Sequence, residues 1–164
     1  MTRKFIDMHC DTISELQKSE AGESLLENHL CVHMEGMEKA GTMIQFFACF
    51  ANGKDYVEGP PVWNAGHRQI SPEAWDLAYG AVLDMIRRLR REENEKLRGI
   101  RSYEEIQENV RLDRISAIAT VEEGGVLNGR AKRLEELYRE GIRLITLTWN
   151  YENCLGYPNS RDSE

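Results

Sequence analysis

Residues 115–125 read ISAIATVEEGG, and this stretch decides the fold class. Its first seven residues are nearly all apolar or β-branched, which is typical of a strand buried on both faces of a parallel sheet. Three further segments have the same character and are bounded by Gly, Asp or Asn, namely residues 5–9, 43–50 and 142–149. The sequence therefore predicts about four buried parallel strands.

Helical patterns lie between these strands. Residues 71–73 read SPE, a helix start with a capping hydroxyl, a proline at the first helical position and an acid in the first turn. Residues 102–105 form a capping box that opens another helix, and further helices are predicted over 34–40 and 130–140. This alternation predicts an α/β fold built from βα units. Residues 51–69 show no periodicity, and a loop of this length is usually functional or mobile.

The composition limits the class of protein. The chain has 164 residues, and we treat residues 1–164 as one unit. Its net charge is −7, whereas nucleic-acid-binding proteins usually carry a basic surface, so we expect no nucleic-acid partner. No apolar run reaches the ~20 residues of a membrane span, so we expect no membrane partner. The four cysteines are scattered without a C-x-x-C motif and no signal-peptide pattern precedes them, which favours free thiols and a cytoplasmic location.

Candidate metal ligands surround the end of the first predicted strand. Asp7, His9 and Asp11 alternate there, and this spacing predicts that their side chains share one face. Sites in parallel α/β sheets form at the carboxyl ends of strands, and an imidazole with a carboxylate suits zinc or manganese. A structural alternative makes His9 a satisfied core histidine and Asp11 the cap of a helix beginning near Thr12.

Glu122 and Glu123 end the predicted strand 115–121, at the same rim as His9 and Asp11. Alternation along the strand places Glu122 on the face that carries its Ser and Thr residues, and Glu123 on the other face. A polar face suits a site better than a face packed against helices. We therefore expect Glu122 to point into the site and Glu123 to be a surface acid, with the following glycines supplying the turn. The alternative makes both acids surface residues.

The end of the fourth predicted strand adds polar side chains to this rim. Thr146, Thr148 and Asn150 share one face. The structural alternative makes Asn150 and Asn153 turn formers and Trp149 a packing residue.

The remaining histidines and motifs carry less information. His29 and His33 have the i, i+4 spacing of a helical metal pair, but no third ligand is near, which favours a surface pair. His67 has no assignable role. The chain lacks G-x-S-x-G, G-x-x-x-x-G-K-[ST] and G-x-G-x-x-G, so serine hydrolases and nucleotide-binding proteins have no motif support.

Four segments together resemble a known family. FIDMHCDT, GTMIQFFACF, ATVEEGG and LYREGIRLITLTWNYEN resemble, in this order, the membrane (renal) dipeptidase family, including its bacterial cytoplasmic members. The resemblance extends over nearly all 164 residues. It implies a (βα)8 barrel with a two-zinc site that hydrolyses dipeptides, often with a D-residue at the C-terminal position.

The resemblance also assigns roles to residues of this chain. His9 and Asp11 match the pair that binds one zinc ion. Glu122 matches the carboxylate that bridges both ions and is the expected catalytic group, with Glu123 as the alternative. Trp149 stands where the family usually has a substrate-contacting His, so Trp149 and Asn150 are the expected substrate contacts.

The chain is short for this fold, since a (βα)8 barrel needs roughly 250 residues. We expect an N-terminal half-barrel, either a fragment of a longer enzyme or a truncated form without activity. The second half of the family supplies two further His ligands and a carboxylate. Two alternatives remain: another two-metal hydrolase of the amidohydrolase type, and a non-catalytic half-barrel that self-associates through its open edges.

Overall fold

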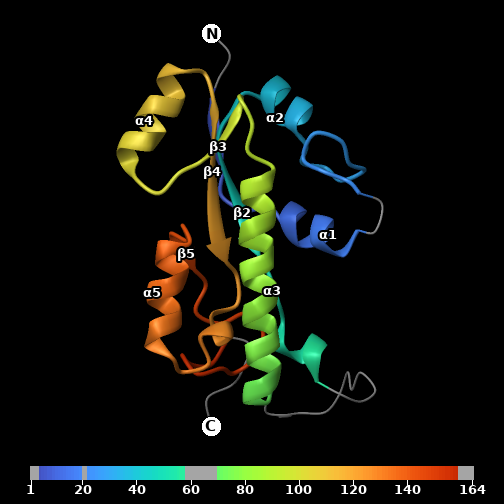
Figure 1. Ribbon diagram of the computed structural model, residues 1–164, viewed down its shortest axis with the longest axis vertical. Coiled ribbons are helices and arrows are strands. Elements are labelled where there is room, and N and C mark those ends of the chain that lie inside the picture. Colours follow the sequence, from blue (N-terminus) through green and yellow to red (C-terminus); the bar gives the residue numbers. More distant parts are fainter. Residues whose placement is uncertain (1–3, 20–21, 58–69, 159–164) are drawn as a thin grey trace.

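The computed structural model describes residues 4–19, 22–57 and 70–158 (Figure 1). A five-stranded parallel sheet has the strand order β1-β2-β4-β3, and β5 also pairs with β4. The strands are β1 (Phe5–Asp7), β2 (Thr42–Cys49), β3 (Leu97–Gly99), β4 (Ile115–Val121) and β5 (Leu144–Ile145). The helices are α1 (Thr12–Lys18), α2 (Met34–Ala40), α3 (Pro72–Arg91), α4 (Tyr103–Arg111) and α5 (Ala131–Arg139). Short 3-10 helices cover Gly53–Tyr56 and Gly124–Leu127.

The sheet contains the four predicted strands and one more. The additional strand, β3, pairs with the start of β4, with Leu97 opposite Ile115. The last predicted strand is much shorter than expected, because β5 covers only Leu144–Ile145 and pairs with the end of β4. Since β2 occupies the other edge of β4, β3 and β5 share one edge. β3 therefore takes the place that a longer final strand would fill.

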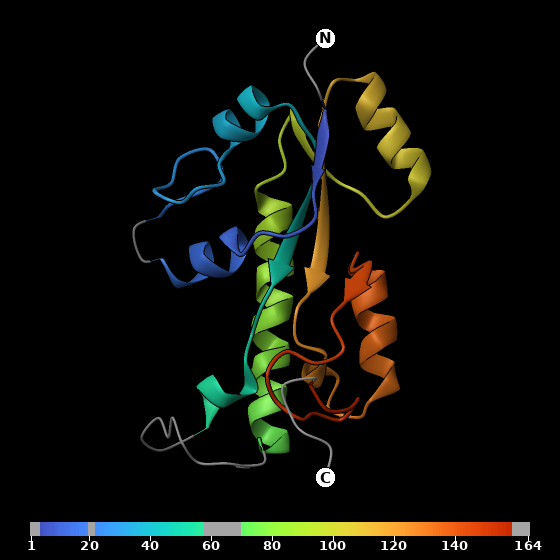
Figure 2. The ribbon, with the colours of Figure 1, turned by 180° about the vertical axis from the view of Figure 1, so that it is seen from behind.

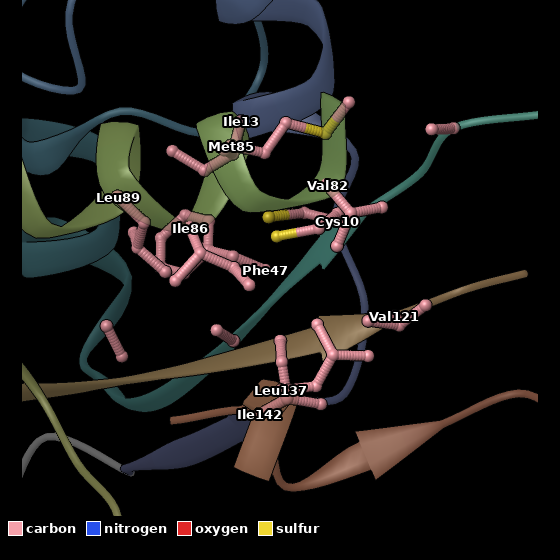
Figure 3. Close-up of a cluster of buried hydrophobic side chains, with 14 of the residues drawn as sticks. Cys10, Ile13, Phe47, Val82, Met85, Ile86, Leu89, Val121, Leu137 and Ile142 are labelled. Atoms are coloured by element: carbon pink, nitrogen blue, oxygen red, sulfur yellow. The ribbon is translucent and has the colours of Figure 1, made fainter. Parts of the chain in front are cut away.

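Helices α1, α2, α3 and α5 contribute to the core on one face of the sheet, whereas Ile106 of α4 packs against a smaller cluster on the other face. In Figure 2 the strands lie in front of α3, which runs along the back of the sheet. Figure 3 shows part of this core, where Phe47 of β2 lies beside Ile86 of α3, and Val121 of β4 lies near Leu137 and Ile142. Ala117, Ala119 and Val121 of β4 all belong to this core, whereas Ile118 joins a separate cluster with Ile44 and Ile100. The alternation predicted for β4 is therefore confirmed.

Local signals define the helix starts as the sequence predicts. The Ser71 hydroxyl accepts a hydrogen bond from the Ala74 N–H, and Pro72 begins α3. Ser102 and Glu105 form both halves of the capping box of α4. Within the described ranges, no helix has the length and apolar character needed to cross a bilayer. Of the loop 51–69, residues 58–69 lie outside the described residues.

Candidate metal centre

Three side chains converge at the carboxyl ends of β1 and β4. The ligand atoms of His9, Asp11 and Glu122 all lie within 4.8 Å of one another. His9 Nε2 is 3.4 Å from Asp11 Oδ1 and 3.7 Å from Glu122 Oε2. The convergence expected from strand alternation is present, and no second group of this kind occurs in the described part of the chain.

The backbone between His9 and Asp11 explains their shared direction. The Cys10 N–H donates to the Phe46 carbonyl, and the Cys10 carbonyl accepts from the Ala48 N–H, which fixes this segment against β2. The Cys10 side chain is buried in the core. Because alternate side chains of an extended chain point to opposite sides, His9 and Asp11 point away from the core together.

The structural alternative is wrong for His9, and for Asp11 it holds only for its position at the start of α1. The His9 side chain is 50% exposed, so His9 is not a core histidine. Asp11 occupies the N-cap position of α1, but its side chain makes no capping hydrogen bond. Both side chains therefore remain available to a ligand. Asp7 does not join them, because its carboxylate accepts hydrogen bonds from the Gln45 amide and the His9 N–H.

Cys10 lies beside the centre in sequence without contributing to it. Burial raises the pKa of the Cys10 thiol to about 11, and burial also raises the pKa of Cys49 to about 12. Metal ligation and nucleophilic attack both need the thiolate. These two cysteines therefore act as core residues.

Glu122 is the least exposed member of the metal-ligand group. It follows the last residue of β4, and its side chain is 20% exposed. Burial, together with the negative charge of Asp11, raises the pKa of the Glu122 carboxyl above its usual range. Burial disfavours the charged form of a carboxyl, and a nearby negative charge disfavours it further.

The prediction that Glu123 is a surface acid is wrong. Glu123 is 1% exposed, and its carboxylate accepts three hydrogen bonds. The donors are the Gly125 N–H at 2.8 Å, the Trp149 N–H at 3.2 Å and the Asn153 amide at 2.6 Å. Glu123 therefore fastens the end of β4 to the segment that follows β5.

The two glycines after these acids are needed for close packing. A Cβ on Gly125 would lie 2.3 Å from the ring of Trp75, and one on Gly124 would lie 2.7 Å from the Leu147 carbonyl oxygen. Neither glycine has a positive φ. The two glycines begin the 3-10 turn Gly124–Leu127, as the sequence predicts, and the reason for glycine there is steric, since the chain passes directly against Trp75 and residue 147.

Trp149 lies beside the metal-ligand group. Together with Phe50 it lines a cavity of about 240 Å³, whose other walls are Asp11, Ser14, Glu15, Lys18 and Glu122. Asn150 is exposed and is not among the lining residues. The structure thus brings one of the two predicted substrate contacts to the centre. Phe50 and the α1 residues have no motif and were not identified from the sequence.

The other histidines take structural positions, as the sequence favours. The His29 ring contacts Glu23 at 2.5 Å on the surface. His33 is the N-cap of α2 and accepts from the Gly36 N–H. His67 lies outside the described residues.

The fold and the centre together define a class of protein. A parallel βα sheet with a His/Asp/Glu group at its strand ends is typical of metal-dependent hydrolases. The sequence model of the family described as membrane dipeptidase (peptidase family M19) matches residues 1–163. The chain therefore belongs to this family of metallopeptidases. No curated protein matches the chain.

Solved structures share the fold. Dipeptidase AC, a metallo peptidase, has a TM-score of 0.70 at 18% identity, over 92% of this chain and 44% of that one. A metallo peptidase from Rhodobacter sphaeroides, liganded with a phosphinate mimic of the dipeptide L-Ala-D-Ala, has a TM-score of 0.71 at 18% identity, over 93% and 47%. An amidohydrolase from Pseudomonas aeruginosa has a TM-score of 0.57 at 11% identity, over 78% and 33%. The chain spans less than half the length of these structures, and its fold is the N-terminal half of a TIM-like barrel.

Proposed function

We propose that this chain carries the first half of a zinc-dependent dipeptidase site. The observation that supports this proposal is the convergence of His9, Asp11 and Glu122 at the strand ends in a chain of the membrane dipeptidase family. The structure from Rhodobacter sphaeroides holds a dipeptide mimic, which supports dipeptides as the substrate class. A cytoplasmic location is part of the same proposal and is supported by four free cysteines.

The donor set suits zinc. One imidazole nitrogen and two carboxylates are ligands that zinc accepts. Tetrahedral ligands ~2.0–2.2 Å from one zinc ion lie about 3.3–3.6 Å from each other. The separations of 3.4 Å and 3.7 Å from His9 Nε2 to the two acids are close to this range.

Each residue then has a part in the reaction. His9 and Asp11 would hold one ion, and Glu122 would contribute a carboxylate shared with a second ion. Bound zinc activates water and polarises the scissile carbonyl. A raised pKa also suits the Glu122 carboxyl for proton exchange with the reacting groups.

We further propose that the chain works with a second half-barrel, either a continuation of the chain or a second copy. Among the described residues, the outer edges of β1 and β5 have no partner strand. Beside β5, a cavity of about 290 Å³ runs along α5, where Leu134, Tyr138 and Leu144 are 49%, 62% and 41% exposed. Open strand edges next to apolar side chains favour pairing with another chain.

Zinc titration and turnover measurements test the proposal together. We expect calorimetry to detect zinc binding to the 164-residue chain, and His9→Ala to weaken that binding at least tenfold. The chain alone should not hydrolyse dipeptides, because the family's remaining ligands belong to the second half. His29→Ala is the matched control and should bind zinc normally. Equal zinc binding by the chain and by His9→Ala would disprove the site.

A further inference from the structure

The cavity beside the metal-ligand group has two unlike walls. Phe50 and Trp149 form an aromatic wall, and Ser14, Glu15 and Lys18 of α1 form a helical wall. The two walls adjoin, because the Ser14 hydroxyl accepts a hydrogen bond from the Phe50 N–H. Asp11 and Glu122 complete the lining, so a molecule held by the metal-ligand group lies next to the two rings.

The aromatic wall is held firmly in place. The Phe50 and Trp149 rings are 4.9 Å apart at their centroids with a tilt of 58°, and Tyr151 supports Trp149 from 5.9 Å. Lys54 Nζ lies 3.3 Å from the centroid of the Tyr151 ring. The Trp149 backbone is fixed to the buried Glu123 carboxylate. Because the rings are already arranged, little ordering is needed when a ligand binds.

The helical wall offers few unused polar groups. The Ser14 hydroxyl donates to the Ala48 carbonyl at 2.8 Å and accepts from the Phe50 N–H at 3.0 Å. Glu15 and Lys18 form an ion pair with each other at 2.8 Å. The Ser14 hydroxyl is thus already bonded to backbone, and Glu15 and Lys18 are exposed to solvent, so the aromatic rings are the preformed contact that this cavity offers to a ligand side chain.

We propose that this cavity is the specificity pocket for an aromatic side chain of the dipeptide, with Trp149 and Phe50 as the residues that select it. The proposal rests on the dipeptidase function proposed above. The cavity is open to solvent and measures about 240 Å³, which leaves room for a phenyl ring. A third ring can join the Phe50–Trp149 pair in the tilted geometry that aromatic rings prefer, about 4.5–7 Å between centroids. Trp149 would thus bind the surface of the substrate side chain.

Nuclear magnetic resonance can test the pocket without the reaction. The 15N-labelled chain is titrated with N-acetyl-phenylalanine amide and, in parallel, with N-acetyl-alanine amide. We expect the Trp149 indole and Phe50 amide signals to shift with the phenyl compound only. Trp149→Phe should keep binding within about threefold, and Trp149→His and Trp149→Ala should each weaken it at least fivefold. Tyr103→Ala, at a side chain 66% exposed on α4, is the control and should bind like the parent chain.

The outcomes separate the pocket from the metal function. Equal shifts with both compounds, or no shift with either, would overturn the pocket, whatever the zinc titration gives. Phenyl binding that depends on Trp149, in a chain that does not bind zinc, would support the pocket and disprove the metal centre. Retained binding by Trp149→Ala would show that another surface takes the ring.

Discussion

Glu122 and Glu123 are adjacent but lie in opposite environments, so two separate variants, Glu122→Gln and Glu123→Gln, test the role assigned to each acid. Glutamine has nearly the same shape as glutamate, so each variant tests charge and hydrogen bonding. Glu123 Oε1 accepts from Gly125 and Asn153, and Oε2 accepts from Trp149. A glutamine that keeps its oxygen toward Gly125 turns its NH₂ group toward the Trp149 N–H, so a donor meets a donor.

The expected loss of stability in Glu123→Gln follows from these contacts. A hydrogen bond to a charged group contributes about 1.5–3 kcal/mol. Glu123→Gln loses one such bond and weakens two, so we expect the free energy of unfolding to fall by about 3 kcal/mol. A chain of this size loses about 2–4 °C in Tm per kcal/mol, which predicts a drop of about 6–12 °C.

Glu122→Gln should behave in the opposite way. Its charge lies near Asp11 in a partly buried place, which raises the pKa of the Glu122 carboxyl. Removing that charge relieves repulsion, so the metal-free Tm should stay constant or rise slightly. Saturating zinc stabilises a protein by about 2.7 kcal/mol at 100 times Kd, and Glu122→Gln should lose most of this gain because it removes a ligand.

Thermal melts followed by circular dichroism, with and without zinc, measure both effects. Glu123→Gln should melt early yet still respond to zinc, and Glu122→Gln should melt normally and respond weakly. The reverse pattern would refute the assignment and transfer the metal role to Glu123. Glu27→Gln, at an exposed position outside the helices, is the matched control and should change neither quantity.

Three other predictions follow from separate features. Gly125→Ala should lower the free energy of unfolding by at least ~2 kcal/mol in chemical denaturation, because its Cβ would overlap Trp75; Gly80→Ala, where no atom lies within 4 Å, should not. Light scattering at micromolar concentration should give a mass above that of one chain. The double variant Leu134→Glu/Tyr138→Glu, which places charges beside the open edge of β5, should reduce this mass. A single-chain mass with a cooperative melt would refute self-association. As the pH falls, zinc binding should weaken, because protons compete with zinc for the imidazole and carboxylate ligands. Affinity constant down to pH 5 would contradict this. In the metal-free chain, the raised pKa of Glu122 should make the free energy of unfolding decline as the pH rises through the folded-state pKa.

Local signals in the sequence account for most of the framework. Alternation in residues 115–121 assigns the two faces of β4, and capping residues mark the starts of α3 and α4. The same alternation brings Glu122 toward His9 and Asp11. The three-residue strand β3 escaped prediction because it is too short to show a period and carries Arg98 at its centre.

The features that could not be predicted from the sequence depend on contacts with residues far away along the chain. Glu123 looks like a loop acid until Trp149 and Asn153, which are 26 and 30 residues away, supply its donors. Gly125 is recognisable as a turn residue, but its close contact with Trp75, 50 residues earlier, is not. Phe50 follows β2 without any motif and becomes a site residue only because Trp149 stacks on it.

The neighbouring acids therefore connect two parts of the site. Glu122 joins the metal-ligand group, and Glu123, one residue later, holds the backbone of Trp149, which forms the wall of the adjacent cavity. A shift at the end of β4 would move the metal-ligand group and the aromatic wall together. Because one short turn sets both positions, the distance from the metal-ligand group to the wall is fixed by the fold, and that distance limits which side chains the cavity can accept.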